Sequence, residues 1–255
     1  MFFDVLHQFQ VTPIIVSPNV CGFQSVLTNE VIILLCLSFI SMYVYLSLNF
    51  NNKGFSLLPN NWQAFLELIY KLPLSLVVEN IKSKEAQKFF PIVFSVFAGV
   101  LFLNLIGLLP YSYTLTSQLI ITFLLSFSVF IGINILAIKK HGLKFFGLFL
   151  PGGTSVPLAF LLVPIEIVSY FFKPISLGTR LFANMMAGHT LLKVIAGFCA
   201  TMTGTGSFFL FILQYIPLFI MVPLFALEFG VAAIQAFVFA VLTCIYIQDS
   251  LYATH

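Results

Sequence analysis

Charged residues are scarce in this chain. Of its 255 residues only 7% are Asp, Glu, Lys or Arg, whereas 60% are hydrophobic. Soluble domains carry about 25% charged and roughly 45–50% apolar residues. A soluble fold of this length could not cover its surface with so few charges, and several apolar runs reach the ~18–20 residues that span a bilayer. The composition therefore excludes a soluble globular protein and indicates a membrane protein.

Other absences exclude several kinds of chemistry. Neither GxxxxGK(S/T) nor GxGxxG occurs, so the sequence offers no loop that would cradle the phosphates of a nucleotide. The four cysteines show no CxxC spacing, and we expect no zinc site, no disulfide framework, no metal and no cofactor. The net charge of +3 comes from lysines clustered between apolar runs, so it does not indicate nucleic-acid binding. The cysteines are interpreted as small apolar side chains in buried positions: Cys21, Cys36, Cys199 and Cys244.

Long apolar runs, by contrast, are abundant. Three have the length of one crossing, and two have about 42 residues each, which as helices would be about 63 Å long against a hydrocarbon core of ~30 Å. The two long runs could form four short spans or two long helices, and their prolines together with the lack of a polar turn favour long, bent helices. We predict an all-α polytopic membrane protein with about five membrane-crossing helices, the last two long and strongly tilted. The runs lie at roughly 31–48, 89–109, 118–138, 157–200 and 207–248.

A more polar stretch separates the first two runs and has the pattern of an amphipathic helix. Apolar residues recur there at helical spacing, and Gln63, Glu67 and Lys71 line the other side. Such a helix suits the membrane surface, although packing on a partner protein explains it equally well. We therefore divide the chain into an N-terminal span with a surface segment, 1–88, and a membrane channel domain, 89–255. The apolar side of the helix consists of Trp62, Phe65, Leu66, Ile69 and Leu72.

The lysines predict the orientation in the membrane. With five crossings, eight lysines fall in the connections on one side, and the connections at 110–117 and 201–206 carry none. Because positive residues stay on the inner side, we expect the N-terminus outside and the C-terminus inside. The inner lysines are Lys53, Lys71, Lys82, Lys84, Lys88, Lys139, Lys140 and Lys144.

The last two runs nevertheless contain ionisable residues, which are costly inside a membrane and usually functional there. Arg180 is the only arginine in the chain. At about 100° per residue, one face of the fourth run carries Glu166, Lys173, Ser176, Arg180 and Asn184. His189 points to the opposite face, and Glu228 and Gln235 share a face of the fifth run. Asp249, at the inner end of that run, is interpreted as a solvated helix end.

The predicted orientation gives these groups an order in depth. Glu166 lies toward the inside, and His189 can meet Glu228 on the outer side of Arg180. The layout predicts two half-paths for protons, separated by the fixed positive charge of a buried arginine, Arg180. Arginine suits that divide because, unlike lysine, it stays charged in proteins. A carboxylate passing Arg180 would give up its proton and would regain one in an apolar setting. No carboxylate in this chain is free to move, so it must come from a partner.

Two segments resemble a known family. SLGTRLFANMMAGHTLL at 176–192 and LEFGVAAIQAFVF at 227–239 are similar to subunit a of F-type ATP synthases. PGGTSVPLAFLLVPIEIVSYFFKP resembles the plant, protist and alphaproteobacterial branch, and the similarity covers roughly 90–250. The resemblance implies a proton-translocating stator subunit of a rotary ATP synthase. It also implies a chain without catalytic chemistry of its own, in the mitochondrial inner membrane or a bacterial plasma membrane. In a mitochondrion the N-terminus would face the intermembrane space and the C-terminus the matrix.

The resemblance also assigns roles to residues and partners. Arg180 matches the family's essential arginine, which faces the acidic residues of the rotating c-ring, and Asn184 and Gln235 match polar residues near it. His189 and Glu228 match the half-channel on the side where protons are taken up during synthesis, and Glu166 matches the acid near the exit. Ser176 lies on the face of the arginine, and Lys173 has no assured role. The implied partners are the c-ring of proteolipid subunits, the peripheral stalk and other membrane-sector subunits, and membrane lipid.

Alternatives remain open at this stage. The chain could be a secondary cation/proton transporter, although no internal repeat of the kind common in transporters is visible. A purely structural subunit would not need Arg180. His189 and Glu228 could bind a metal, but two ligands are few for a zinc site. Asn184 and Gln235 could simply hydrogen-bond between helices, and Lys173 could be a lysine whose stem lies on apolar surface.

Overall fold

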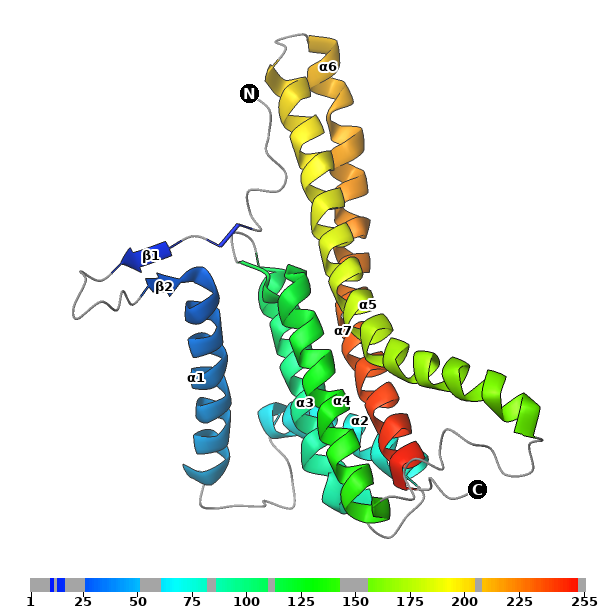
Figure 1. The fold of residues 1–255 in the computed structure, drawn as a ribbon. Helices are drawn as coiled ribbons and strands as arrows, with labels where there is room; N and C mark the ends of the chain where they lie inside the picture. The colour runs from blue at the N-terminus through cyan, green and yellow to red at the C-terminus, as the bar shows by residue number, and fades with distance from the viewer. Residues whose placement is uncertain are drawn as a thin grey trace. The chain divides into compact units, whose positions relative to one another are not determined.

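The computed structural model describes residues 10–11, 13–16, 26–50, 61–81, 86–109, 113–142, 156–204 and 208–251. Apart from one short antiparallel pair of strands, Pro13–Val16 (β1) and Val26–Thr28 (β2), these residues form helices joined by short connections, as the composition predicts. The helices are α1 (Asn29–Phe50), α2 (Asn61–Asn80), α3 (Ala86–Gly107), the 3-10 turn η2 (Leu115–Ser117), α4 (Leu119–His141), α5 (Val156–Gly204), α6 (Phe208–Leu213) and α7 (Tyr215–Leu251) (Figure 1).

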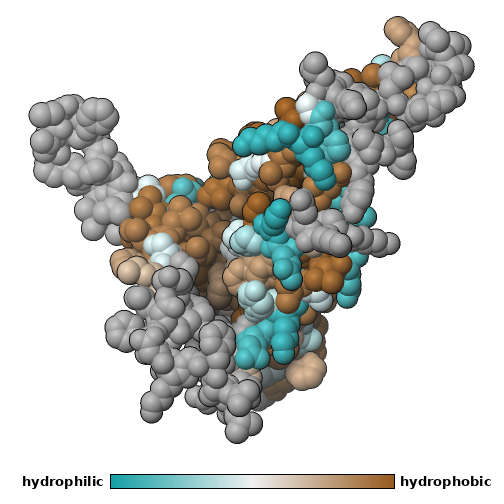
Figure 2. Space-filling view, turned by 90° about the horizontal axis from the view of Figure 1, so that it is seen from below, coloured by the Kyte–Doolittle hydropathy of each residue, from teal (hydrophilic) through white to brown (hydrophobic). Residues whose placement is uncertain are grey.

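Four of these helices are long and apolar enough to cross a membrane: α3, α4, α5 and α7. The first predicted span lies within α1, which is helical over 22 residues and contains the apolar run 31–48. The all-α polytopic prediction is confirmed by these helices. The exposed surface agrees with a membrane setting, because hydrophobic colours dominate the described residues in Figure 2 and side chains such as Phe160, Phe219 and Ile120 are more than 70% exposed.

The first long apolar run forms a single helix. α5 has 49 residues and keeps both Pro164 and Pro174 inside it. The choice of one long helix over two short spans is therefore confirmed for this segment, and its tilt in the membrane stays a prediction.

The second long run differs from its prediction. It divides into α6 and the 37-residue α7, with a break at Gln214. Pro217 explains the position of the break, because proline has no N–H to donate to the carbonyl four residues earlier, that of Leu213. The helix resumes with the hydrogen bond from the Leu218 N–H to the Gln214 carbonyl, 3.3 Å long.

The chain forms two compact units that interleave along the sequence. The first consists of Met1–Phe65, Leu101–Gln118 and Asn184–Ala233. The second consists of Leu66–Val100, Leu119–Ala183 and Ile234–His255. Each unit thus contains a section of α5 and a section of α7. The predicted division at residue 88 stays a prediction.

The first unit has a small apolar core and a polar loop. Leu108, Met185 and Ala232 bring the end of α3 against α5 and α7. In the loop before α4, the Tyr113 hydroxyl donates to Glu30 Oε1 at 3.0 Å and accepts from Gln118 Nε2 at 2.5 Å. Burial, and then the Glu30 carboxylate, raise the pKa of Tyr113 to about 12. The phenol therefore stays neutral and holds the first turn of α1 to this loop.

The second unit is built from α2, α3, α4 and the remaining sections of α5 and α7. Tyr70 of α2 packs on Phe90 and Phe94 of α3, with ring centroids 4.6 and 5.8 Å away. The helix predicted around Trp62 is α2. On its predicted apolar side, Phe65 and Leu72 are 53% and 44% exposed, and Ile69 is half-buried. The buried residues of α2 are Pro73, Leu76 and Val77. Whether α2 lies on a membrane stays a prediction.

Helices α4, α5 and α7 meet closely within this unit. A β-carbon on Gly178 would lie 3.1 Å from the Thr122 carbonyl oxygen, so the glycine allows α5 to approach α4. The Ser126 hydroxyl, also from α4, donates to the Pro174 carbonyl. Lys140 Nζ lies 3.3 Å from the carbonyl oxygen of Leu251 and caps the last turn of α7. Cations near a helix C-terminus stabilise it.

The cysteine prediction is only partly right. Cys244 is buried, Cys199 is partly exposed and Cys36 is exposed. Burial of the thiol is therefore confirmed for Cys244 and not for Cys36. Cys21 lies outside the described residues, as do the inner lysines Lys53, Lys82, Lys84 and Lys144.

Candidate functional site

His189 and Glu228 meet in the first unit, where the sections of α5 and α7 run side by side (Figure 1). His189 Nδ1 lies 3.4 Å from Glu228 Oε1. The two side chains are only 12% and 5% exposed. The pairing expected from the opposed directions of the two helices is therefore present within the chain itself.

A glycine makes room for this pair. A β-carbon on Gly188 would lie 2.7 Å from Glu228 Oε1 and 3.0 Å from its Cδ. Real β-carbons do not approach other atoms so closely, so the carboxyl group occupies space that any other residue at 188 would fill. Gly188 thus lets the carboxylate of α7 lie directly against the backbone of α5, beside His189.

The surroundings of Glu228 suit proton transfer. Neither carboxylate oxygen has a hydrogen-bond donor among the described residues, and His189 is at ion-pair distance. A buried carboxylate needs a cation or a proton to offset its lost hydration. An imidazole and a carboxyl group in contact can exchange one proton, which changes both charges together. Such a pair can pass protons without leaving an isolated charge in an apolar place.

Asn104 supports α7 one turn from Glu228, and the sequence analysis did not single it out. It is fully buried on α3, and its side-chain N–H donates to the Ala232 carbonyl at 3.3 Å. Its Oδ1 has no partner among the described residues. Asn104 could have been found from the sequence, because it is an asparagine inside the apolar run 89–109. Polar side chains in spans commonly bind a neighbouring helix.

Arg180 belongs to the second unit and differs in its surroundings. Its side chain is exposed in the chain alone, and so is Ser176 one turn earlier. Among the described residues, no ion pair is recorded for Arg180. Burial of the arginine within the membrane sector therefore stays a prediction, because this chain alone does not bury the side chain. The guanidinium lies on an open face of α5, and any burial must come from a lipid or protein neighbour.

The remaining predicted site residues differ in exposure. Glu166 is exposed on α5, fourteen residues before Arg180, a separation of about 21 Å along an ideal helix. Gln235 of α7 is buried, 3% exposed, in the unit that also contains Arg180. Asn184 is half-buried in the unit that contains His189. The structure thus brings His189 and Glu228 into contact and leaves Glu166, Ser176 and Arg180 open to a neighbour.

A pair of charges that the sequence analysis did not connect joins α5 to α7 in the second unit. Lys173 Nζ lies 3.6 Å from Asp249 Oδ2. Asp249 is half-exposed, as predicted for a helix end, but it is also an ion-pair partner. Within the described residues, no group of three or more His, Cys, Asp or Glu could hold a metal ion.

Comparison with known proteins places the chain in a family. The family model described as ATP synthase A chain matches residues 30–248. The chain belongs to the ATP synthase A chain family. Its resemblance to subunit a, which rests on 176–192 and 227–239, is thereby confirmed. All of the predicted site residues lie within the matched range.

Individual relatives agree over nearly the whole A chain. The sequence is 45% identical over 250 residues to ATP synthase subunit a of Brassica napus, covering 96% of this chain and 95% of that one. It is 46% identical over 252 residues to ATP synthase subunit a of Pylaiella littoralis, covering 98% and 99%. With the protein of Marchantia polymorpha it shares 48% over 226 residues, 88% of each chain.

Proposed function

We propose that this A chain conducts protons through the membrane sector of a rotary F-type ATP synthase and couples their passage to rotation of a c-ring. It serves as a stator, without catalytic chemistry of its own. The observation that carries the proposal is the contrast between the buried His189–Glu228 pair and Arg180, which is exposed and has no ion-pair partner among the described residues.

The pair supplies the outer half-path. A proton arriving from the outer side is accepted by the His189–Glu228 pair, which is enclosed by α5 and α7. From there it passes to a carboxylate of the ring. Because the pair is nearly inaccessible in the chain, it can hold a proton at a defined place while keeping bulk water from the apolar interior.

Arg180 separates the outer half-path from the inner one. A ring carboxylate that approaches the exposed guanidinium is stabilised as an anion and releases its proton. The arginine cannot take that proton itself because guanidinium groups stay charged in proteins. The released proton leaves by the inner half-path, for which Glu166, exposed on the same helix, is the acceptor. The ring then turns in one direction, because the carboxylate must be neutral to enter the apolar bilayer.

Surroundings and partners follow from this role. The c-ring covers the open face of α5 that carries Ser176 and Arg180, and Asn184 and Gln235 contribute polar groups near that face. The peripheral stalk and other membrane-sector subunits are further partners. We place the chain in the mitochondrial inner membrane, with its N-terminus toward the intermembrane space and its C-terminus toward the matrix, as the lysine distribution predicts.

The test is the substitution Arg180→Ala in the assembled complex. We expect ATP-driven proton pumping into vesicles to be abolished, whereas the amount of assembled complex, measured by recovery of the other subunits, is unchanged. A secondary transporter would instead move protons after reconstitution of this chain alone. Normal pumping in the Arg180→Ala complex, or proton transport by the isolated chain, would refute the proposal.

A further inference from the structure

Lys173 lies on the same face of α5 as Arg180, at a distance that creates a problem for the proposed mechanism. Seven residues separate the two, which on an ideal helix places them about 20° apart around the axis and about 10.5 Å apart along it. A ring carboxylate attracted by Arg180 would meet a second cation two turns away. Two strong attractive sites on one path would hold the carboxylate at the wrong place.

The structure provides a counter-charge for this second cation. Asp249, in the last turn of α7, places its Oδ2 3.6 Å from Lys173 Nζ. The same ammonium lies 5.6 Å from the ring centre of Tyr170 and 5.3 Å from that of Tyr246. Contacts of this kind between a cation and the face of an aromatic ring are attractive. The lysine is therefore held by one carboxylate and two rings from two helices.

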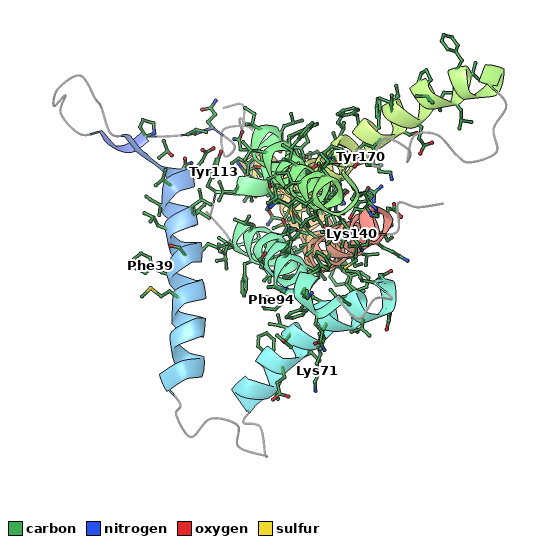
Figure 3. All side chains as sticks on the ribbon, turned by 60° about the horizontal axis from the view of Figure 1, so that its bottom comes forward. Phe39, Lys71, Phe94, Tyr113, Lys140 and Tyr170 are labelled. Atoms are coloured by element: carbon green, nitrogen blue, oxygen red, sulfur yellow. The ribbon has the colours of Figure 1, made fainter. Side chains whose placement is uncertain are left out.

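The position of Tyr170 is fixed by α4, so the arrangement is not a chance contact of flexible side chains. The Tyr170 hydroxyl donates to Asn134 Oδ1, and the Asn134 amide donates to the Phe130 carbonyl at 3.0 Å. The Tyr170 ring also packs on Phe130, with ring centroids 5.0 Å apart, on the α4 side of α5 (Figure 3). Three helices thus determine where the ammonium of Lys173 lies.

We propose that Asp249 masks the charge of Lys173, so that the uncompensated charge on this face of α5 is that of Arg180. Asp249 acts here as a positioning residue and does not itself carry the transported proton. The inference rests on the proposed function, because masking matters only if ring carboxylates pass this face. The proposal gives Lys173 and Asp249 different roles. In a purely structural ion pair, loss of either residue would have the same effect.

The test compares three complexes by ATP-driven proton pumping per assembled complex. In Asp249→Asn the lysine is unmasked, and we expect pumping to slow roughly tenfold, as an added ion-pair attraction of moderate strength would produce. In Lys173→Met the remaining acid is half-exposed and hydrated, so pumping stays within about twofold of the original. In the double variant both charges are absent, and pumping returns to within about twofold of that of the original complex.

The alternatives give different patterns. If Asp249 carried the proton, the double variant would be as slow as Asp249→Asn. If the pair were only a structural tie, both single variants would be slowed equally and the double variant would not recover. Unchanged pumping in Asp249→Asn would also overturn the proposal. These results are distinct from failure of the proposed function, which is judged by Arg180→Ala and by proton transport of the isolated chain.

Two further variants secure the comparison. If Asp249→Asn lowers assembly, the exchange of charges, Lys173→Asp with Asp249→Lys, keeps the pair compensated and should restore pumping to within about twofold. Failure of the exchange to recover would count against masking. The matched control is Glu67→Gln, which removes the acid of an exposed ion pair on α2, where Lys71 Nζ lies 3.8 Å from Glu67 Oε2. We expect no change in pumping for that variant.

Discussion

The pair His189–Glu228 and the single residue Arg180 differ in how completely the chain surrounds them. The pair is enclosed: its side chains are 12% and 5% exposed, it is in contact across two helices, and a glycine leaves room for it. Arg180 lies exposed, without an ion-pair partner among the described residues. The residues of this chain complete the first site, whereas the second site is completed only when a neighbouring molecule covers Arg180.

This difference has a physical reason in the proposed mechanism. A fixed proton relay works best when its geometry is set by one rigid protein. A contact with a moving partner must instead stay open, so that a new carboxylate can enter at each step. An arginine that was already paired inside the chain would have to break that pair every time, which would raise the barrier to rotation.

After the complete loss expected from Arg180→Ala, the largest effect is expected from Arg180→Lys, which keeps a cationic side chain but can lose its charge. A lysine in an apolar setting gives up its proton readily; if it were charged only about one part in a hundred of the time, coupled ATP synthesis would fall about a hundredfold. The measurement is ATP synthesis in vesicles, together with passive proton leak after removal of the catalytic sector. Normal ATP synthesis in Arg180→Lys would mean that position 180 needs a positive charge but not a permanent one.

A smaller loss is expected from Glu228→Gln at the enclosed site. The amide cannot accept a proton, and positioned acid–base groups are worth ~10²–10⁴-fold in proton transfer, although water relays recover part of that. We expect proton flux to fall roughly tenfold or more, whereas the ratio of protons moved to ATP made stays constant. If proton flux in this variant no longer drove ATP synthesis, Glu228 would also be needed to keep the half-paths separate, a role that is proposed here for Arg180 alone.

The enclosed site could largely be predicted from the sequence, and the open one only in part. Helical spacing and opposed chain directions were sufficient to bring His189 and Glu228 together, because two long antiparallel helices have few ways to pair. The exposure of Arg180 could not be predicted, since hydropathy does not distinguish a residue buried by its own chain from one covered by a partner. The same reasoning missed the ion pair between Lys173 and Asp249, which depends on where α7 ends.

The local structure, too, could be predicted from the sequence only in part. One long helix over Val156–Gly204 agrees with the expectation, because the interior prolines bend it without a polar turn. The break at Gln214 was missed because hydropathy stays high across it, although Pro217 removes the donor for the Leu213 carbonyl. The hydrogen bond from Asn104 to Ala232 joins residues 128 apart in sequence. No local pattern predicts which backbone carbonyl a buried asparagine will meet.

The smallest effect is expected from Gly188→Ala, which tests whether enclosure itself matters. The added β-carbon would lie 2.7 Å from Glu228 Oε1, so the carboxyl group, at the end of a flexible side chain, must move away. Its contact with His189 would then lengthen beyond 3.4 Å. Because the displacement is a fraction of an ångström, the loss should be several-fold, short of the ~10²-fold that a full ångström of misplacement can cost.

The matched control for this substitution is Gly230→Ala, on α7 in the same unit, where an added β-carbon meets nothing within 4 Å. Alanine in a helix interior is favoured over glycine by roughly 0.5–1 kcal/mol, so both variants gain helix stability and only Gly188→Ala disturbs the carboxyl group. Proton flux should therefore separate the two variants although their thermal stabilities rise alike. In a Glu228→Gln background the Gly188 substitution should add little further loss, because the group it displaces no longer transfers protons. Equal flux in the two alanine variants would show that the relay tolerates a looser pair, and the contrast between an enclosed site and an open one would then rest on Arg180 alone.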